Sequence, residues 1–137
     1  MSLCCLLTLA RLIIACQPGF QTHRVAFSPR GPLLVSAEFP FSEVECVRID
    51  VSDIRRHQDN LARTVWKARC PDRSDCLTSV QYGDPGLRTE VESEPLKATG
   101  ASSSCYSCFV RGSAGDGWVS FSVSDEGEFD HCNLHLP

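Results

Sequence analysis

The sequence lacks the features that usually indicate catalysis. It has no Gly-x-Ser-x-Gly elbow, no glycine-rich phosphate loop, and no serine or cysteine in a recognisable activating context. Histidine is scarce, and its four occurrences are His23, His57, His131 and His135. We therefore predict that the chain is not an enzyme and needs no cofactor.

Basic charge is also in short supply. The chain has 13 Lys and Arg against 17 Asp and Glu, a formal net charge of −4, and its basic residues are scattered. Nucleic acid is therefore not expected as a partner. The Asn-x-Ser/Thr motif is missing as well, because Leu-Ala follows Asn60 and Leu-His follows Asn133. N-glycosylation is not expected.

Long apolar runs are absent beyond the first 16 residues, which read MSLCCLLTLARLIIAC. This leader is too short to span a bilayer, and Gln17-Pro18-Gly19 ends it. Small or apolar residues around a cleavage point, Ile13 and Ala15 or Ile14 and Cys16, are typical of a secretory signal peptide. We predict a signal peptide over residues 1–16, a mature domain over residues 17–137, and a secreted product with no membrane span.

Two alternatives for the leader stay open. No Lys or Arg precedes the apolar region, and Arg11 lies inside it, so the segment could be an amphipathic or buried first helix of a cytosolic protein. The run from Ile13 to Cys16 also resembles a bacterial lipobox, in which Cys16 would carry a lipid.

What the chain does have is cysteine, nine in 137 residues. Cys4, Cys5 and Cys16 fall in the leader. The six in the remainder are Cys46, Cys70, Cys76, Cys105, Cys108 and Cys132. An even number of cysteines in a short exported chain indicates a disulfide framework. We therefore expect these six to form disulfides that stabilise a small extracellular domain with a modest core.

Strand patterns outnumber helical ones. Over residues 106–123, apolar and polar residues alternate on both sides of a Gly/Asp-rich turn, which predicts a β-hairpin with serines on its wet face. Short apolar runs around Leu34 and Val47 predict two more strands. The one helix candidate is the polar segment 51–67, capped by Ser52, which could equally be an exposed connection. The predicted class is mostly β.

Turns and loops separate these elements. Residues 83–86 (GDPG) predict a turn, and residues 97–104 (KATGASSS) predict a flexible loop. The acidic residues 125–130 could bind Ca²⁺, but a solvated turn is the ordinary explanation. Glu90, Glu92 and Glu94 alternate, as on an exposed edge strand.

The cysteine spacings allow more than one chemistry. Cys70 and Cys76 flank a Pro/Asp turn; they could pair with each other, although closely spaced cysteines more often reach a distant strand. Cys105 and Cys108 form a C-x-x-C motif, typical of a redox pair or half a zinc site, with His131 and His135 as further ligands. For an exported chain we expect bridges and no metal. For a cytosolic chain, zinc becomes the better interpretation.

The segment from Thr64 reads TVWKARCPDRSDC and resembles part of the interleukin-17 family of cytokines. Val65, Trp66, Ala68, Cys70 and Cys76 occupy corresponding places. Upstream, Arg48-Ile49-Asp50 and Gln58-Asp59 resemble the family's polar approach to this segment, and downstream VESEPL (residues 91–96) is similar to a further strand. A cysteine then follows in the next loop, where Cys105 stands.

This resemblance implies a secreted, cystine-knot-like β protein that forms a homodimer and binds a cell-surface receptor. It also implies that Cys70 and Cys76 reach a C-terminal strand, with Cys132 as one acceptor. The family's closing Gly-Cys-x-Cys signature is absent, so Cys108 would have to take the missing role.

A second resemblance is to an immunoglobulin-like β-sandwich. Asp125, Gly127 and Phe129 followed by Cys132 are similar to that family's tyrosine corner, although two residues, not one, separate the aromatic ring from the cysteine. This alternative implies a core disulfide between Cys46 and Cys132, packed against Trp66.

The sequence thus predicts a secreted, disulfide-stabilised β domain that binds a protein partner, in its sharpest form an interleukin-17-like ligand. Aromatic side chains are the expected anchors of the binding surface. The candidates are Trp66, Tyr82, Tyr106 and Trp118. The alternatives are an immunoglobulin-like extracellular domain, an intracellular zinc protein using Cys70, Cys76, Cys105 and Cys108, and a reading frame with no evolved activity.

Overall fold

The computed structural model describes residues 23–50, 62–100 and 104–132, and the regular structure in these ranges is entirely β. The strands are β1 (Val25–Phe27), β2 (Leu34–Phe41), β3 (Glu43–Asp50), β4 (Ala62–Arg69), β5 (Leu77–Gln81), β6 (Arg88–Val91), β7 (Ser104–Gly112), β8 (Gly115–Val123) and β9 (Phe129–His131). The predicted signal peptide lies outside the described residues. Among the described residues, no helix is long and apolar enough to cross a membrane.

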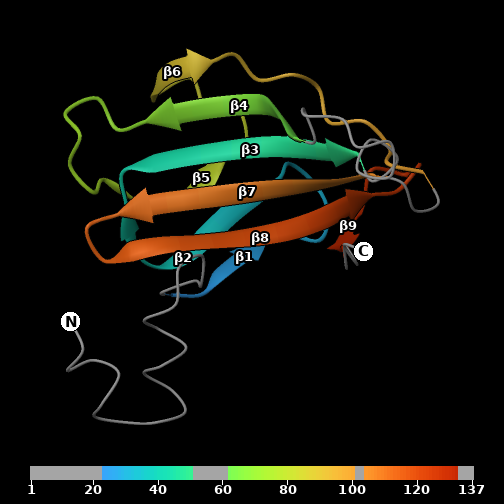
Figure 1. The fold of residues 1–137 in the computed structure, drawn as a ribbon, viewed down its shortest axis with the longest axis horizontal. Coiled ribbons are helices and arrows are strands. Elements are labelled where there is room, and N and C mark those ends of the chain that lie inside the picture. Colours follow the sequence, from blue (N-terminus) through green and yellow to red (C-terminus); the bar gives the residue numbers. More distant parts are fainter. Residues whose placement is uncertain (1–22, 51–61, 101–103, 133–137) are drawn as a thin grey trace, which may run out of the picture.

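The strands form two antiparallel sheets that pack face to face (Figure 1). The smaller sheet has the order β1-β2-β5, and the larger has the order β6-β4-β3-β7-β8-β9. In the view of Figure 1, β1, β2 and β5 lie behind the larger sheet. The prediction of a mostly β domain is confirmed.

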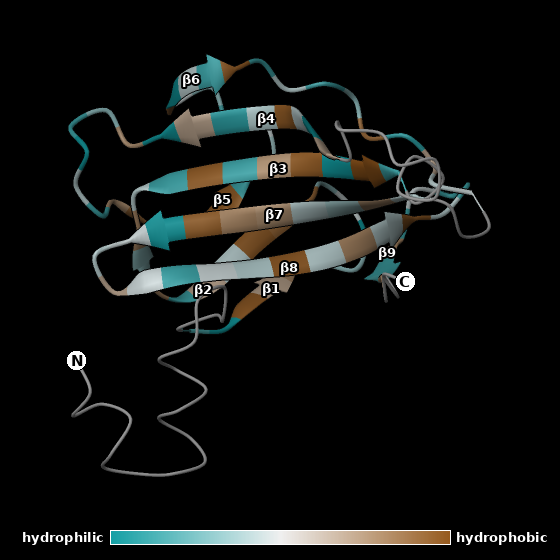
Figure 2. Ribbon diagram, viewed as in Figure 1, coloured by the Kyte–Doolittle hydropathy of each residue, from teal (hydrophilic) through white to brown (hydrophobic). Residues whose placement is uncertain are grey.

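The core lies between the sheets and follows the alternation of the strands. On β3, the inward-facing Val44 and Cys46 are fully buried, whereas Glu43 and Glu45, which alternate with them, face outward. Figure 2 shows this pattern as alternating brown and teal bands along β3. The smaller sheet contributes Leu33, Val35, Phe41 and Val80 to the same cluster. Each sheet therefore has one face covered by the other sheet.

The predicted hairpin is confirmed as β7 and β8. Tyr106, Cys108 and Val110 on β7, like Val119 and Phe121 on β8, point inward and are buried. The turn is tighter than expected, because Gly112 already pairs with Gly115. The serine face is only partly wet, since Ser107 is buried and its hydroxyl lies 2.6 Å from that of Ser120.

The predicted helix over residues 51–67 is wrong for residues 62–67, which belong to β4; residues 51–61 lie outside the described part of the chain. The register shifts on β4, where Cys46 pairs with Trp66 but Val47 pairs with Thr64. Val65 is the extra residue of this β-bulge, which turns Val65 and Trp66 inward together. The bulge breaks the alternation that would otherwise have indicated a strand.

The six predicted cysteines form three pairs: Cys46–Cys108, Cys70–Cys76 and Cys105–Cys132. Cys70 and Cys76 therefore pair with each other across the short turn, contrary to the expectation that each reaches a distant strand. The pairing of Cys70 or Cys76 with Cys132, implied by the interleukin-17 resemblance, does not occur. Closure is local because β4 ends at Arg69 and β5 begins at Leu77, which leaves only a turn between the two cysteines.

The other expected cysteine groupings differ as well. Cys46 bonds to Cys108, its neighbour in the register of β3 and β7, so this bridge lies within one sheet. The bridge between Cys46 and Cys132 implied by the immunoglobulin resemblance is not formed. Cys105 and Cys108 belong to opposite faces of β7 and to different pairs, which separates the two halves of the C-x-x-C motif.

Gly112 marks a close approach between the two sheets. A β-carbon there would lie 2.7 Å from the carbonyl oxygen of Pro40 and 2.8 Å from the α-carbon of Phe41. Both neighbours are backbone atoms, so we expect Gly112→Ala to lower the free energy of unfolding by about 1–3 kcal/mol, measured by urea denaturation.

Gly86→Ala is the matched control for this substitution. Its β-carbon would meet a carboxylate oxygen of Asp84 at 3.2 Å and no backbone atom within 4 Å. We expect a change of about 0.5 kcal/mol or less. Equal stability losses in the two variants would contradict the close approach of the sheets at Gly112.

Candidate functional site

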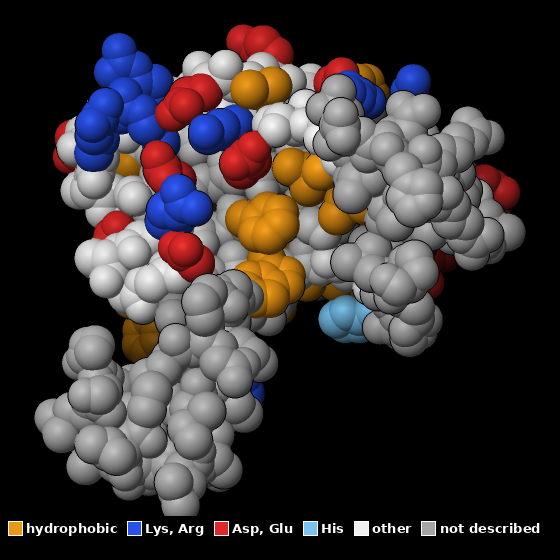
Figure 3. All heavy atoms as spheres, in the orientation of Figure 1, with side chains coloured by type: hydrophobic (Ala, Val, Ile, Leu, Met, Phe, Trp, Pro, Cys, Tyr) orange, Lys and Arg blue, Asp and Glu red, His pale blue; other side chains and the backbone are white. Residues whose placement is uncertain are grey.

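The outer face of the larger sheet carries the candidate site. Side chains that alternate with the buried ones on β3, β4, β7 and β8 project from this face. We define the outer-face patch as Glu43, Glu45, Lys67, Phe109, Arg111, Asp116 and Trp118. Figure 3 shows apolar side chains at its centre, with acidic and basic groups gathered on one side.

An aromatic pair forms the centre of the outer-face patch. Phe109 on β7 and Trp118 on β8 are direct cross-strand partners, and their ring centroids lie 6.4 Å apart. Phe109 is 41% exposed, which makes it one of three large apolar side chains that stand out from the described surface. The pair therefore presents apolar area to solvent from two neighbouring strands.

Charged side chains border this pair. Arg111 lies between two carboxylates, with Nη1 3.9 Å from Oε2 of Glu43 and Nε 3.4 Å from Oδ1 of Asp116. The Arg111 side chain is 71% exposed, so these ion pairs add little to stability. Glu45 accepts a hydrogen bond of 2.7 Å from the hydroxyl of Thr64. The charged side chains around the aromatic pair thus include both acidic and basic groups that a protein partner could contact.

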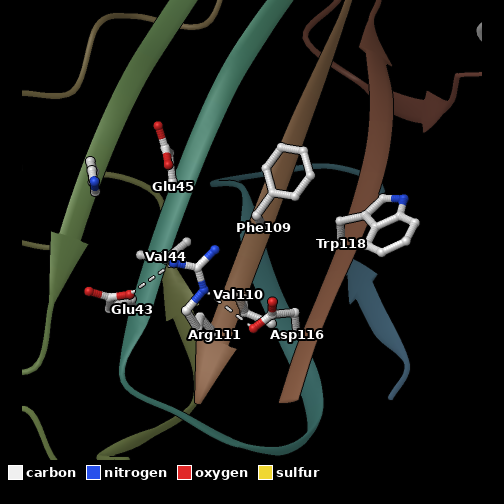
Figure 4. A pocket seen from close by; sticks show the side chains of 9 residues that line it. Glu43, Val44, Glu45, Phe109, Val110, Arg111, Asp116 and Trp118 are labelled. Atoms are coloured by element: carbon white, nitrogen blue, oxygen red, sulfur yellow. Dashed lines mark ion pairs between the residues drawn. The ribbon is translucent and has the colours of Figure 1, made fainter. Parts of the chain in front are cut away.

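A hollow of about 410 Å³ lies over this part of the sheet. Figure 4 shows Phe109 and Trp118 on one side of it, and the ion pairs of Arg111 with Glu43 and Asp116 on the other. Carboxylates, one guanidinium, one ammonium and two aromatic rings line it, together with Val44 and Val110. Its lining includes no serine, cysteine or histidine. This set of groups is suited to recognition through apolar contact and ion pairs.

The structure places one of the four predicted aromatic anchors in the patch. Trp66 and Tyr106 are core residues, 1% and 2% exposed. Tyr82 is half-buried, and its hydroxyl donates a 2.7 Å hydrogen bond to the carbonyl of Glu94; burial raises the pKa of Tyr82. Only Trp118 lies on the outer face. Phe109 was not among the predicted anchors, although its place between Cys108 and Val110 in the alternating run put it on that face.

The alternative metal sites do not come together in the described residues. The four cysteines of the proposed zinc site are divided among three disulfides. His131 packs against the ring of Phe27 at 4.9 Å between centroids, and His135 lies outside the described residues. The acidic residues before β9 form an exposed turn, as expected. No group of three or more potential metal ligands occurs within residues 23–50, 62–100 and 104–132.

Comparisons with protein-family models, with curated proteins and with solved structures find no match to this chain.

Proposed function

We propose that the chain is a secreted ligand that binds a cell-surface receptor protein through its outer-face patch. The interleukin-17 resemblance of the segment from Thr64 to Cys76 supports a ligand of the cytokine type. The observation that carries the proposal is the outer-face pair of the exposed Phe109 and the half-buried Trp118 inside a charged border. Aromatic residues surrounded by polar ones are the usual energetic centre of a protein–protein interface.

The disulfides support the export part of the proposal. Three cysteine pairs at bonding distance are compatible with an extracellular protein, because disulfides persist in oxidising compartments. Disulfides indicate an oxidising compartment whether or not they form a cystine knot, and the cystine knot is implied by the resemblance alone. The proposal therefore rests on the surface of the larger sheet and not on the topology of the bridges.

The test is binding of labelled protein, recovered from the medium of secreting cells, to intact cells of the species of origin. Wild-type protein should bind saturably and be displaced by unlabelled protein. We expect Phe109→Ala and Trp118→Ala each to weaken binding about 30-fold, as truncation of an interface hot spot does. Phe39→Ala is the control, because Phe39 is 44% exposed but belongs to the smaller sheet.

Three outcomes would contradict this proposal. Absence of saturable binding would show that these cells carry no receptor for the protein. Unchanged binding of Phe109→Ala would show that the outer-face patch is not the binding surface. The third outcome involves the homodimer that the resemblance implies. If the outer-face patch binds a receptor, the homodimer must form through another surface. Light scattering that shows a dimer dissociated by Phe109→Ala would assign the patch to a second copy of the chain instead.

A further inference from the structure

A second hollow, of about 380 Å³, lies at the end of β3 and shares no residue with the outer-face patch. Its walls come from β3, β4, β7 and the segment that precedes β7 in the chain. The lining residues are Arg48, Arg63, Glu94, Pro95, Lys97 and Tyr106. Three of these six are cations, and one is an anion.

Positive charge exceeds negative charge in this pocket, although the whole chain has a net charge of −4. Glu94 is paired with Arg63, whose Nη1 lies 2.5 Å from Oε2 of the carboxylate, and this hydrogen bond raises the pKa of Arg63. Among the described residues, no carboxylate lies within ion-pair distance of Arg48 or Lys97. Two cations therefore remain without an acidic partner in this part of the structure.

The strand register places two of the arginines side by side. Arg48 on β3 lies directly opposite Arg63 on β4, and like charges in directly opposed positions destabilise a sheet. Arg48 is nevertheless held in place, because its Nη1 donates a 2.8 Å hydrogen bond to the hydroxyl of Tyr106. Its guanidinium carbon lies 5.3 Å from the centre of the same ring. The carboxylate of Glu94 offsets the charge of Arg63, which leaves the charge of Arg48 for a bound anion.

The hydroxyl of Tyr106 provides an independent indication of a ligand. It accepts two hydrogen bonds, from Nη1 of Arg48 at 2.8 Å and from the backbone N–H of Lys97 at 3.1 Å. A phenol also donates one proton, and no described residue accepts it. The ring cannot turn away to find an acceptor, because it is 2% exposed and stacks on Phe121 with centroids 5.7 Å apart. The pocket therefore contains a fixed donor for which the described residues provide no acceptor.

We propose that this pocket binds a tetrahedral oxyanion, a phosphate or sulfate group carried on a small molecule. The remaining N–H groups of Arg48 bind two of its oxygens, as the planar guanidinium fork does with phosphate groups. The ammonium of Lys97 supplies a mobile positive charge, and the hydroxyl of Tyr106 donates to a third oxygen. This site is independent of the receptor proposed above.

The experiment is a titration of the whole mature domain, followed by NMR at low ionic strength. The probes are inorganic phosphate, inorganic sulfate, and N-acetylglucosamine carrying a 6-phosphate or a 6-sulfate. Unmodified N-acetylglucosamine is the control probe. We expect saturable shifts centred on Arg48, Lys97 and Tyr106, with a dissociation constant of about 1 mM or lower. Affinity should fall as salt is added.

The variants test each contact. Arg48→Gln and Lys97→Gln should each raise the dissociation constant about tenfold, since a hydrogen bond to a charged group is lost. Tyr106→Phe keeps the stacked ring and removes only the hydroxyl, and should weaken binding to a similar extent. Arg88→Gln on β6 is the charge-matched control and should bind as the wild type does, because Arg88 lies outside the pocket. Circular dichroism confirms that each variant is folded.

Each result has a definite consequence. A preference for the 6-phosphate or the 6-sulfate identifies the source of the group, and equal affinity shows that the tetrahedral group alone is recognised. Shifts that never saturate would overturn the proposal. So would an equal loss of affinity in Arg48→Gln and Arg88→Gln, because that result would reflect net charge and not the pocket.

Discussion

Replacing Cys46 and Cys108 together with alanine is expected to lower the free energy of unfolding by roughly 4 kcal/mol. The two cysteines are 62 positions apart, and a cross-link between distant positions restricts the unfolded chain strongly. Small domains have a total stability of about 5–15 kcal/mol. Loss of this one bridge should therefore leave a large fraction of the molecules unfolded at physiological temperature.

The other two bridges provide controls for the loop-length argument. Cys105 and Cys132 are 27 positions apart, and Cys70 and Cys76 only 6. The same entropy model predicts losses of roughly 3.5 and 2 kcal/mol for these double alanine variants. Urea denaturation under non-oxidising and non-reducing conditions measures all three. A loss for the Cys70 and Cys76 variant that exceeds the loss for the Cys46 and Cys108 variant would contradict this order.

These values link stability to the redox state of the compartment. Reduction removes all three bridges at once and leaves the fold to depend on a core that lies between a six-stranded and a three-stranded sheet. A chain of this kind benefits most from an oxidising environment. The cysteines from which the sequence predicts export are thus also the groups whose oxidation is expected to stabilise the fold.

The hairpin of β7 and β8 shows what the sequence can predict well. The large core-facing side chains recur at every second position, Tyr106, Cys108 and Val110 on β7 and Val119, Phe121 and Val123 on β8, so the local pattern and the two-layer packing require the same orientation. The turn between them is marked by Gly112 and Gly115. On these two strands the core-facing positions follow the period of two, and prediction succeeds.

β4 shows why prediction fails elsewhere. Val65 and Trp66 both face the core because the bulge adds one residue to β4 opposite β3. Two adjacent inward residues look like part of a helical face when the partner strand is unknown. The bulge is a property of the pairing between β3 and β4, and no pattern within β4 alone specifies it.

The disulfide pairs are a second example of information that lies in tertiary contacts. The six cysteines could be identified from composition, but six cysteines allow 15 connectivities. Cys46 and Cys108 pair because β3 and β7 are neighbours in one register, with their α-carbons 4.0 Å apart. That adjacency places β7 beside β3 and not beside β6, the strand that precedes it in the chain, and the spacing of the cysteines cannot show this.

The residue type at the centre of the candidate site, an aromatic side chain, could be predicted from the sequence, but which aromatic residues lie there could not. Aromatic anchors were expected from the sequence, and the structure leaves Trp118 and Phe109 on the outer face while it buries Trp66 and Tyr106. The distinction depends on which face of each strand meets the smaller sheet. For Phe109, the alternation with the buried Cys108 carried the necessary signal.

Phe121→Ala should be among the most destabilising single substitutions, with an expected loss of about 3–5 kcal/mol. Phe121 is fully buried, and its ring contacts those of Phe27, Tyr106 and Phe129 at centroid distances of 5.4, 5.7 and 5.5 Å. Phe27 belongs to β1 and Tyr106 to β7, so this cluster joins the two sheets. Truncation would leave a cavity, because the remaining rings keep the two sheets apart and prevent them from closing over it.

Phe109→Ala is the matched control, because the same residue type on the adjacent strand is 41% exposed on the opposite face. Its stability should change by about 0.5 kcal/mol or less, while its binding to cells should fall. Phe121→Leu should keep the fold at a cost of roughly 1–2 kcal/mol and retain binding. Urea denaturation and the cell-binding titration, measured on the same preparations, separate the two roles. If Phe109→Ala proved as destabilising as Phe121→Ala, the outer face of the larger sheet would be part of a packed interior and could not be the docking surface.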